Sequence, residues 1–168
     1  VYPLVEKSEK VDLRNAVESA RRLAAALPEA TVDLVHGRLD PAERGGAMAR
    51  FEGGETQILV ATSVIEVGVD VPNATLMVVE HAERFGLAQL HQLRGRVGRG
   101  SRPGRCIFVS RGGGENSEAR LSALLSTTDG FRIADADLQI RGPGEFLGTR
   151  QHGVLPDLRI ADLLRDTR

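Results

Sequence analysis

Short apolar runs alternate along much of the chain with longer segments in which apolar residues recur every three or four positions. The apolar runs predict strands over 1–5, 32–36, 58–61, 76–79 and 106–109, and the periodic segments predict helices over 9–27, 41–51 and 87–97. Asp40 before Pro41 marks one helix start, and Gly53 marks the end of that helix. Strands that alternate with helices pair in parallel through right-handed crossovers. The pattern therefore predicts a three-layer α/β domain with a mostly parallel sheet.

The alternation stops at three consecutive glycines, residues 112–114. Beyond them no run predicts a strand, and helices are expected over 117–125 and 131–140. A Gly-Pro-Gly break at residues 142–144 turns the chain within this part. We therefore expect two units, an α/β domain over residues 1–112 and a helical extension with a hairpin over residues 113–168.

Charge is distributed unevenly, although the 168 residues carry a net charge of only −1. The stretch from residue 84 to residue 111 has no acidic residue and contains Arg84, Arg94, Arg96, Arg99, Arg102, Arg105 and Arg111. A segment of one sign attracts phosphate groups even when the whole molecule is close to neutral. A solvated basic surface without a ligand is the alternative.

Composition excludes several kinds of site. The single cysteine, Cys106, excludes an internal disulfide and a multi-cysteine metal site, and its apolar neighbours predict a buried strand thiol. The four histidines have no metal-ligand spacing, so no metal site is expected. No apolar stretch approaches the roughly 20 residues that span a bilayer and no secretory signal is present, so we expect no membrane contact and a cytoplasmic location. Val1 stands in place of a starting methionine, within a strand-like run, which suggests a piece of a larger protein.

The most distinctive run is residues 92–99, Gln-Leu-Arg-Gly-Arg-Val-Gly-Arg. On the predicted helix, positions three and four apart share a face, so Gln92, Arg96 and Arg99 would project together. The glycines beside them leave room for a bulky anion. Arginine stays charged and donates in a planar fork, which suits a phosphoryl group. The run predicts a phosphate-binding face, with an exposed basic helix end as the alternative.

Two further stretches directly follow predicted strands. In an open parallel sheet, ligands bind beyond the carboxyl ends of the strands, which is where Thr62 falls. Its hydroxyl suits a phosphate oxygen, Gly68 permits close backbone approach, and Asp70 is a candidate acceptor for a sugar hydroxyl. After another strand, Gly37 and Arg38 offer a nucleic-acid backbone room and charge. A helix cap and simple turns are the alternatives at these positions.

The sequence lacks the parts that would complete a nucleotide site. It has no G-x-x-x-x-G-K-[ST] phosphate loop, and no acidic cluster follows a strand to hold Mg²⁺. The arginines therefore need a nucleotide that another domain supplies, which points to half of a composite ATP site. We expect the chain alone not to hydrolyse ATP.

Three of these segments resemble a known family. Residues 92–99 look like motif VI of the superfamily-two helicases, residues 61–70 like motif V, and residues 1–9 like motif IV. The resemblance implies a RecA-like fold for the α/β domain and identifies it as the second of two motor domains. The first motor domain and a fork-reading wedge domain would belong to the same protein outside this chain.

Other strings narrow the resemblance to one branch. Residues 83–92 resemble the branch that holds RecG and the transcription-repair coupling factor Mfd, and residues 141–151 are similar to the translocation motif that these two share. The strings that favour RecG over Mfd are 69–75, 142–144, 148–153 and 160–166.

The resemblance implies nucleotide-directed roles for individual residues. Arg96 and Arg99 would be arginine fingers on the γ-phosphate of ATP, with Gln92 beside them. A finger of this kind contributes about 10³–10⁵ to the rate of phosphoryl transfer. Gly68 and Asp70 would lie near the nucleotide sugar. ATP and Mg²⁺ would be bound mainly by the first motor domain.

The same resemblance implies DNA contacts and a coupling device. Thr62, Gly37 and Arg38 would approach the DNA backbone. The positions that match the translocation hairpin, which couples cleft closure to movement on duplex DNA, are Arg120, Arg141 and Gln151.

The function that the resemblance implies is that of an ATP-dependent DNA helicase or translocase, a monomer that remodels stalled replication forks and Holliday junctions. Expected partners are branched duplex DNA, the first motor and wedge domains, and single-strand-binding protein. One alternative is an Mfd-like transcription-coupled translocase, which an upstream RNA-polymerase-binding domain would distinguish. The other is a non-enzymatic RecA-like module that binds nucleic acid through residues 84–111, in a manner sensitive to salt and independent of ATP.

Overall fold

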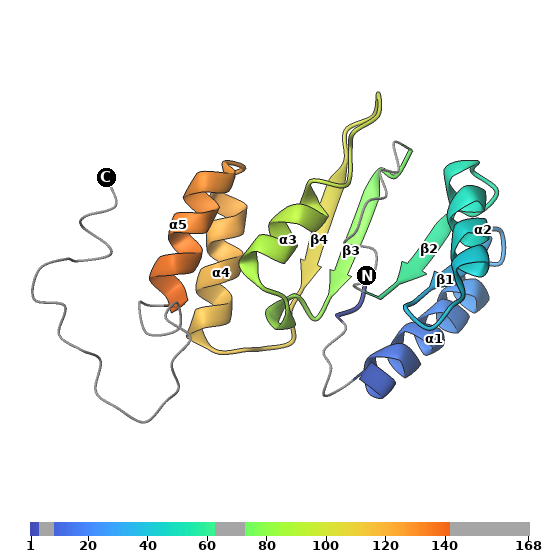
Figure 1. The fold of residues 1–168 in the computed structure, drawn as a ribbon, viewed down its shortest axis with the longest axis horizontal. Helices are drawn as coiled ribbons and strands as arrows, with labels where there is room; N and C mark the ends of the chain where they lie inside the picture. The colour runs from blue at the N-terminus through green and yellow to red at the C-terminus, as the bar shows by residue number, and fades with distance from the viewer. Residues whose placement is uncertain (4–8, 63–72, 142–168) are drawn as a thin grey trace, which may run out of the picture.

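The computed structural model describes residues 1–3, 9–62 and 73–141, apart from the side chains of residues 9–11 and 141. Figure 1 shows the order of the elements along the chain. The elements are α1 (Glu9–Ala26), β1 (Val32–Val35), α2 (Pro41–Glu52), β2 (Ile58–Ala61), β3 (Leu76–Glu80), the 3₁₀ helix η2 (Ala82–Arg84), α3 (Leu87–Arg94), β4 (Arg105–Val109), α4 (Glu115–Ser126) and α5 (Gly130–Arg141).

Two parallel strand pairs form the sheet. β1 pairs with β2 along its whole length, and β3 pairs with β4 in the same way. The first residues of the chain lie between these pairs: the Tyr2 amide donates to the Ala61 carbonyl at 2.8 Å, and the Glu80 amide donates to the Val1 carbonyl at 2.9 Å. The spatial order is therefore β1, β2, residues 1–2, β3 and β4, and every described pair is parallel, as the sequence predicts.

Two apolar clusters hold the helices on the strands. The larger one joins β3 and β4 to α3, α4 and α5, and its buried members are Val79, Ala82, Phe85, Leu87, Leu90, Leu93, Leu124 and Ile133. The smaller one joins β1 to α2 through Val35, Ala47 and Met48. The described helices of the extension, α4 and α5, thus pack on α3 and share its core, which is visible as the row of α5, α4 and α3 beside β4 (Figure 1).

Most element boundaries lie within one residue of the predicted ones, although α4 begins two residues earlier than expected. Asp40 caps α2 in a reciprocal box, because the Glu43 amide donates to Asp40 Oδ1 at 2.8 Å and the Asp40 amide donates to Glu43 Oε2 at 3.3 Å. β2 has the predicted bounds. Cys106 lies half-buried in β4, where burial raises the pKa of its thiol to about 11. Among the helices of the described part, none has the length and apolar character needed to cross a membrane.

Candidate functional site

The predicted arginine helix begins as expected but ends early. α3 ends at Arg94, and the amide of the next residue, Gly95, donates to the His91 carbonyl at 3.0 Å. The prediction of a helix to residue 97 is therefore wrong at its C-terminal end, because two glycines interrupt a pattern that otherwise continues. Of the three side chains expected on one helical face, only Gln92 lies on the helix, where it is exposed.

Arg96 and Arg99 lie in the arginine loop, residues 95–104. Gly98 has a φ of 77°, in the left-handed region that glycine adopts without steric cost, so the backbone turns away from the helix there. Arg99 is exposed, and its Nε donates to the Gly95 carbonyl at 2.6 Å, while Arg96 is half-buried. A turn, not a helix face, therefore presents the two guanidinium groups.

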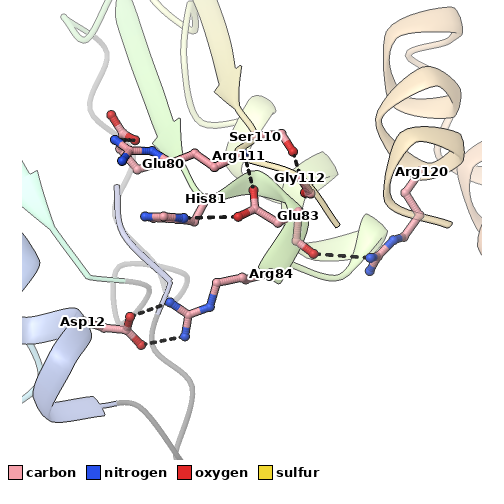
Figure 2. Close-up of polar contacts among 9 residues, drawn as sticks. All are labelled: Asp12, Glu80, His81, Glu83, Arg84, Ser110, Arg111, Gly112 and Arg120. Atoms are coloured by element: carbon pink, nitrogen blue, oxygen red, sulfur yellow. Dashed lines mark hydrogen bonds and ion pairs between the residues drawn. The ribbon is translucent and has the colours of Figure 1, made fainter. Parts of the chain in front are cut away.

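Two of the seven arginines in the basic segment form contacts that hold distant elements of the fold together. The first, Arg84, forms a two-pronged ion pair with Asp12 of α1, with N–O distances of 2.5 and 3.0 Å (Figure 2). The residue Asp12 is only 1% exposed, so the ion pair compensates a charge that is removed from water. The hydrogen bond to Asp12 raises the pKa of Arg84 above its usual value.

Arg94 is the second of these arginines. Its guanidinium donates to the carbonyls of Leu124 and Thr127, the latter at 2.9 Å, and lies 3.0 Å from His91 Nδ1. These carbonyls belong to the C-terminal end of α4 and the residue that follows it, where a helix leaves backbone acceptors unsatisfied. Arg94 thus attaches the helical extension to α3 from within the run that also carries Arg96 and Arg99.

Arg120 makes the converse connection from α4. Its Nη1 donates to the Phe85 carbonyl at 3.2 Å. Its Nη2 donates to the Glu83 carbonyl at 3.3 Å, a contact that Figure 2 shows. This predicted hairpin residue therefore binds the segment that leads into α3. Arg94 and Arg120 together form two cross-connections between the α/β domain and the extension.

Glu83, in the segment before α3, binds the start of the linker between β4 and α4, which contains the glycines 112–114. Its carboxylate lies 3.1 Å from His81 Nδ1 and accepts from the Arg111 amide at 3.2 Å (Figure 2). Burial raises the pKa of Glu83, but hydrogen bonds from its own amide, from His81 and from Arg111 outweigh it, so the net pKa is lowered. The carboxylate therefore stays ionised where the chain leaves β4 for α4.

The predicted DNA-facing residues lie at one edge of the sheet. Thr62 follows β2 and is fully buried, and its amide donates to the Val35 carbonyl at the end of β1 at 3.1 Å. Gly37 and Arg38, two and three residues after the end of β1, form an exposed turn in which the Arg38 amide donates to His36 Nδ1 at 3.2 Å. Parallel pairing thus brings these predicted residues to the same carboxyl-terminal edge.

Several predicted residues lie outside the described part. Gly68, Asp70 and Gln151 belong to undescribed segments, and the side chain of Arg141 is not described either. Within the described residues, no group of three or more histidine, cysteine or carboxylate side chains could hold a metal ion. A hollow of about 440 Å³ lies beside the arginine loop, and its lining residues are Asn73, Thr75, Gly100, Ser101 and Arg102.

Sequence reasoning missed the residues that build this site from a distance. Arg94 stands inside the distinctive run, but nothing local indicates partners 30 and 33 positions away. Asp12 stands 72 positions before Arg84 on the partly polar side of α1, where only its burial reveals a role. Neither the residue types nor their spacing in the sequence indicate the contacts of Arg94 or Asp12.

Two family models match the chain. The model described as helicase conserved C-terminal domain matches residues 5–101, and the model described as ATP-dependent DNA helicase RecG, domain 3, C-terminal, matches residues 127–168. The first match covers more than half of the chain and includes the arginine loop up to residue 101. The second includes α5.

Curated relatives and a solved structure are similar over nearly the whole chain. ATP-dependent DNA helicase RecG of Acidithiobacillus ferridurans is 55% identical over 168 residues, and that of Escherichia coli is 53% identical over 167, each match covering 99% of this chain and 24% of the relative. A solved structure of RecG bound to a three-way DNA junction matches with a TM-score of 0.70 and 48% identity, over 87% of this chain and 19% of that one. The chain therefore spans about a quarter of the length of these relatives.

Proposed function

The chain belongs to the helicase conserved C-terminal domain family, and we propose that it forms the second motor domain of an ATP-dependent DNA helicase of the RecG type that remodels branched DNA. The observation that carries this proposal is the identity of more than half of the residues with RecG relatives across 99% of the chain. The relative solved on a three-way DNA junction supports branched DNA as the class of substrate.

In this proposal ATP binds between the first motor domain, elsewhere in the protein, and the arginine loop. Arg96 and Arg99 approach the γ-phosphate when the two motor domains close, and Gln92 lies beside them on α3. Both guanidinium groups sit on a loop outside the core, one exposed and one half-buried, which suits side chains that act on a ligand held by another domain. Gly68 and Asp70 face the nucleotide sugar, and Mg²⁺ is held mainly by the first motor domain.

DNA binding is assigned to the edge of the sheet that carries Gly37 and Arg38, beside the buried Thr62. The exposed turn at Gly37 and Arg38 supports this assignment, because a glycine and a cation admit a phosphate backbone. Residues 113–168 form the helical extension with the translocation hairpin, in which Arg120, Arg141 and Gln151 couple cleft closure to movement. The bonds from Arg120 to the segment before α3 support that role for it.

The test removes one guanidinium from the full-length protein that contains this chain. Arg99→Ala should lower the kcat of DNA-stimulated ATP hydrolysis by about 10³–10⁵, the usual contribution of an arginine finger, while forked-DNA binding changes little. Arg102→Ala is the matched control, because it removes the same exposed charge from the same loop. Turnover by Arg99→Ala equal to that of the control would refute the assignment.

A further inference from the structure

The backbone of the arginine loop touches itself at two glycines. A Cβ on Gly104 would lie 2.5 Å from the Gly98 nitrogen and 2.6 Å from its Cα. A Cβ on Gly98 would in turn lie 2.5 Å from the Gly104 nitrogen. Because real Cβ atoms do not approach other atoms this closely, the contact accepts glycine alone at both positions.

Both sides of this contact are hydrogen-bonded to the residues that directly precede β3. The Gly98 amide donates to the Ala74 carbonyl at 3.3 Å, and the Arg105 amide donates to the Thr75 carbonyl at 2.8 Å. Residues 99–103, between the two glycines, are all exposed. The loop is therefore a short protrusion whose two ends meet at the contact of Gly98 with Gly104, here called the neck. Arg99 is the first side chain beyond the neck.

We propose that Gly104 is a positioning residue for Arg99: by closing the neck against Gly98, it fixes where the exposed guanidinium sits. This inference rests on the proposed role of Arg99 as an arginine finger. Closing the neck reduces the conformations open to residues 99–103 before any ligand arrives, which is how pre-organisation favours catalysis. Gly104 itself touches no ligand in this scheme.

Gly104 is the better of the two glycines to change. Gly98 has a left-handed φ of 77°, so any other residue there adds backbone strain to the steric conflict. Gly104 is not among the glycines with positive φ, so alanine there opposes the neck contact alone. Gly45→Ala serves as a matched control, because a Cβ on Gly45, in α2, would have nothing within 4 Å.

The experiment is a double-mutant cycle in the full-length protein, with Arg99→Ala, Gly104→Ala and the double variant. Gly104→Ala should lower the kcat of ATP hydrolysis by about 10²-fold, as expected for a group displaced by about 1 Å, with little change in the KM for ATP. Once Arg99 is absent, Gly104→Ala should cost almost nothing more, so the double variant should match Arg99→Ala. Gly45→Ala should retain the original kcat.

The outcomes separate this inference from the proposed function. If Arg99→Ala retains full turnover, the finger assignment fails, and the positioning role fails with it. If Arg99→Ala is slow but Gly104→Ala is not, only the positioning role is overturned. Losses that multiply in the double variant would mean that Gly104→Ala damages the fold in general, which also overturns the positioning role.

A second variant covers the case in which Gly104→Ala does not fold. Pro103 precedes Gly104, and its carbonyl carbon would lie 3.6 Å from a Cβ on Gly98, so it forms part of the neck. Pro103→Gly adds no atom that could clash but frees the backbone of the neck. It should lower kcat without changing nucleotide binding, and only while Arg99 is present. An unchanged kcat in Pro103→Gly would overturn the proposal.

Discussion

Arg94 and Arg99 carry the same guanidinium group five residues apart, and the structure gives them different partners. Arg94 is half-buried and donates to carbonyls at the end of α4, whereas Arg99 is exposed and donates to the Gly95 carbonyl of its own loop. The difference arises because α3 continues through Arg94 and stops directly after it. One arginine of the run therefore attaches α4 to α3, and the other lies on the exposed loop.

We expect Arg94→Ala to lower the free energy of unfolding more than Arg99→Ala does. Removing Arg94 leaves the carbonyls of Leu124 and Thr127 without their donor, which costs about 1–3 kcal/mol for a buried group. Arg99→Ala removes an exposed contact and should change stability by no more than about 0.5 kcal/mol. Urea denaturation of each variant measures both values. Equal losses would mean that Arg94 does not attach α4.

At the scale of elements, a small polar cluster joins α2 to the first strand pair. Asp33 of β1 accepts from Arg50 Nε of α2 at 2.9 Å, and from the hydroxyl of Thr56 at 2.6 Å. The hydrogen bond from Arg50 is the largest reason that the pKa of Asp33 lies below its usual value; burial opposes it, and the bond from Thr56 adds to it. The folded chain therefore stabilises the ionised carboxylate.

This cluster predicts a pH dependence with a definite sign. Because the pKa of Asp33 is lower in the folded chain, its contribution is complete above the unfolded value of about 3.9 and is lost as the pH falls through the folded value. Asp33→Asn should therefore be less stable than the original chain at pH 7, and the difference should shrink below about pH 4. Thermal unfolding at a series of pH values measures this. A difference that stayed constant with pH would contradict the account.

Elements formed by local rules are the ones that the sequence predicts well. β2 is a continuous apolar run, and α2 begins at a capping residue, so both can be predicted without knowing their distant partners. The end of α3 was harder to predict, because the amphipathic pattern continues past Gly95 while the backbone does not. His81, with a φ of 53° before η2, gives no local signal of a left-handed turn.

The candidate site divides in the same way. The arginines of residues 92–99 stand out because residue types and spacing carry the chemistry. The loop that presents them cannot be predicted in the same way. The neck at Gly98 and Gly104 is a backbone contact, and the only sign of it in the sequence is that both residues lack a side chain. Predicting the ion pair of Asp12 and Arg84 would require knowledge of which side chains become buried.

At the scale of the whole molecule, backbone bonds and an ion pair are among the described contacts that join the two strand pairs. Residues 1–2 pair with β2 on one side and with β3 on the other, and α1 reaches the segment after β3 through Asp12 and Arg84 (Figure 2). The ion pair is thus a long-range side-chain connection between the half of the molecule that holds α1 and the half that holds the arginine loop. Its loss should affect the whole fold.

We expect Arg84→Met to be strongly destabilising at pH 7, because it removes a two-pronged ion pair from the buried carboxylate of Asp12. Breaking a buried ion pair costs about 3–5 kcal/mol, and the partial exposure of Arg84, 29% of its side chain, places the expected loss toward the lower end. The double variant Asp12→Leu with Arg84→Met should recover most of this loss, since an apolar pair of similar volume needs no compensating charge.

Urea denaturation of the two single variants and the double variant measures the coupling between Asp12 and Arg84. Asp12→Leu alone should cost less than Arg84→Met, because the partly exposed guanidinium can still reach water. If the double variant were as unstable as the sum of the single ones, the pair would not act as a unit. The other described contacts between the two halves, among them the backbone bonds of residues 1–2 and the bond from Asn73 to the Glu52 carbonyl, would then hold them together.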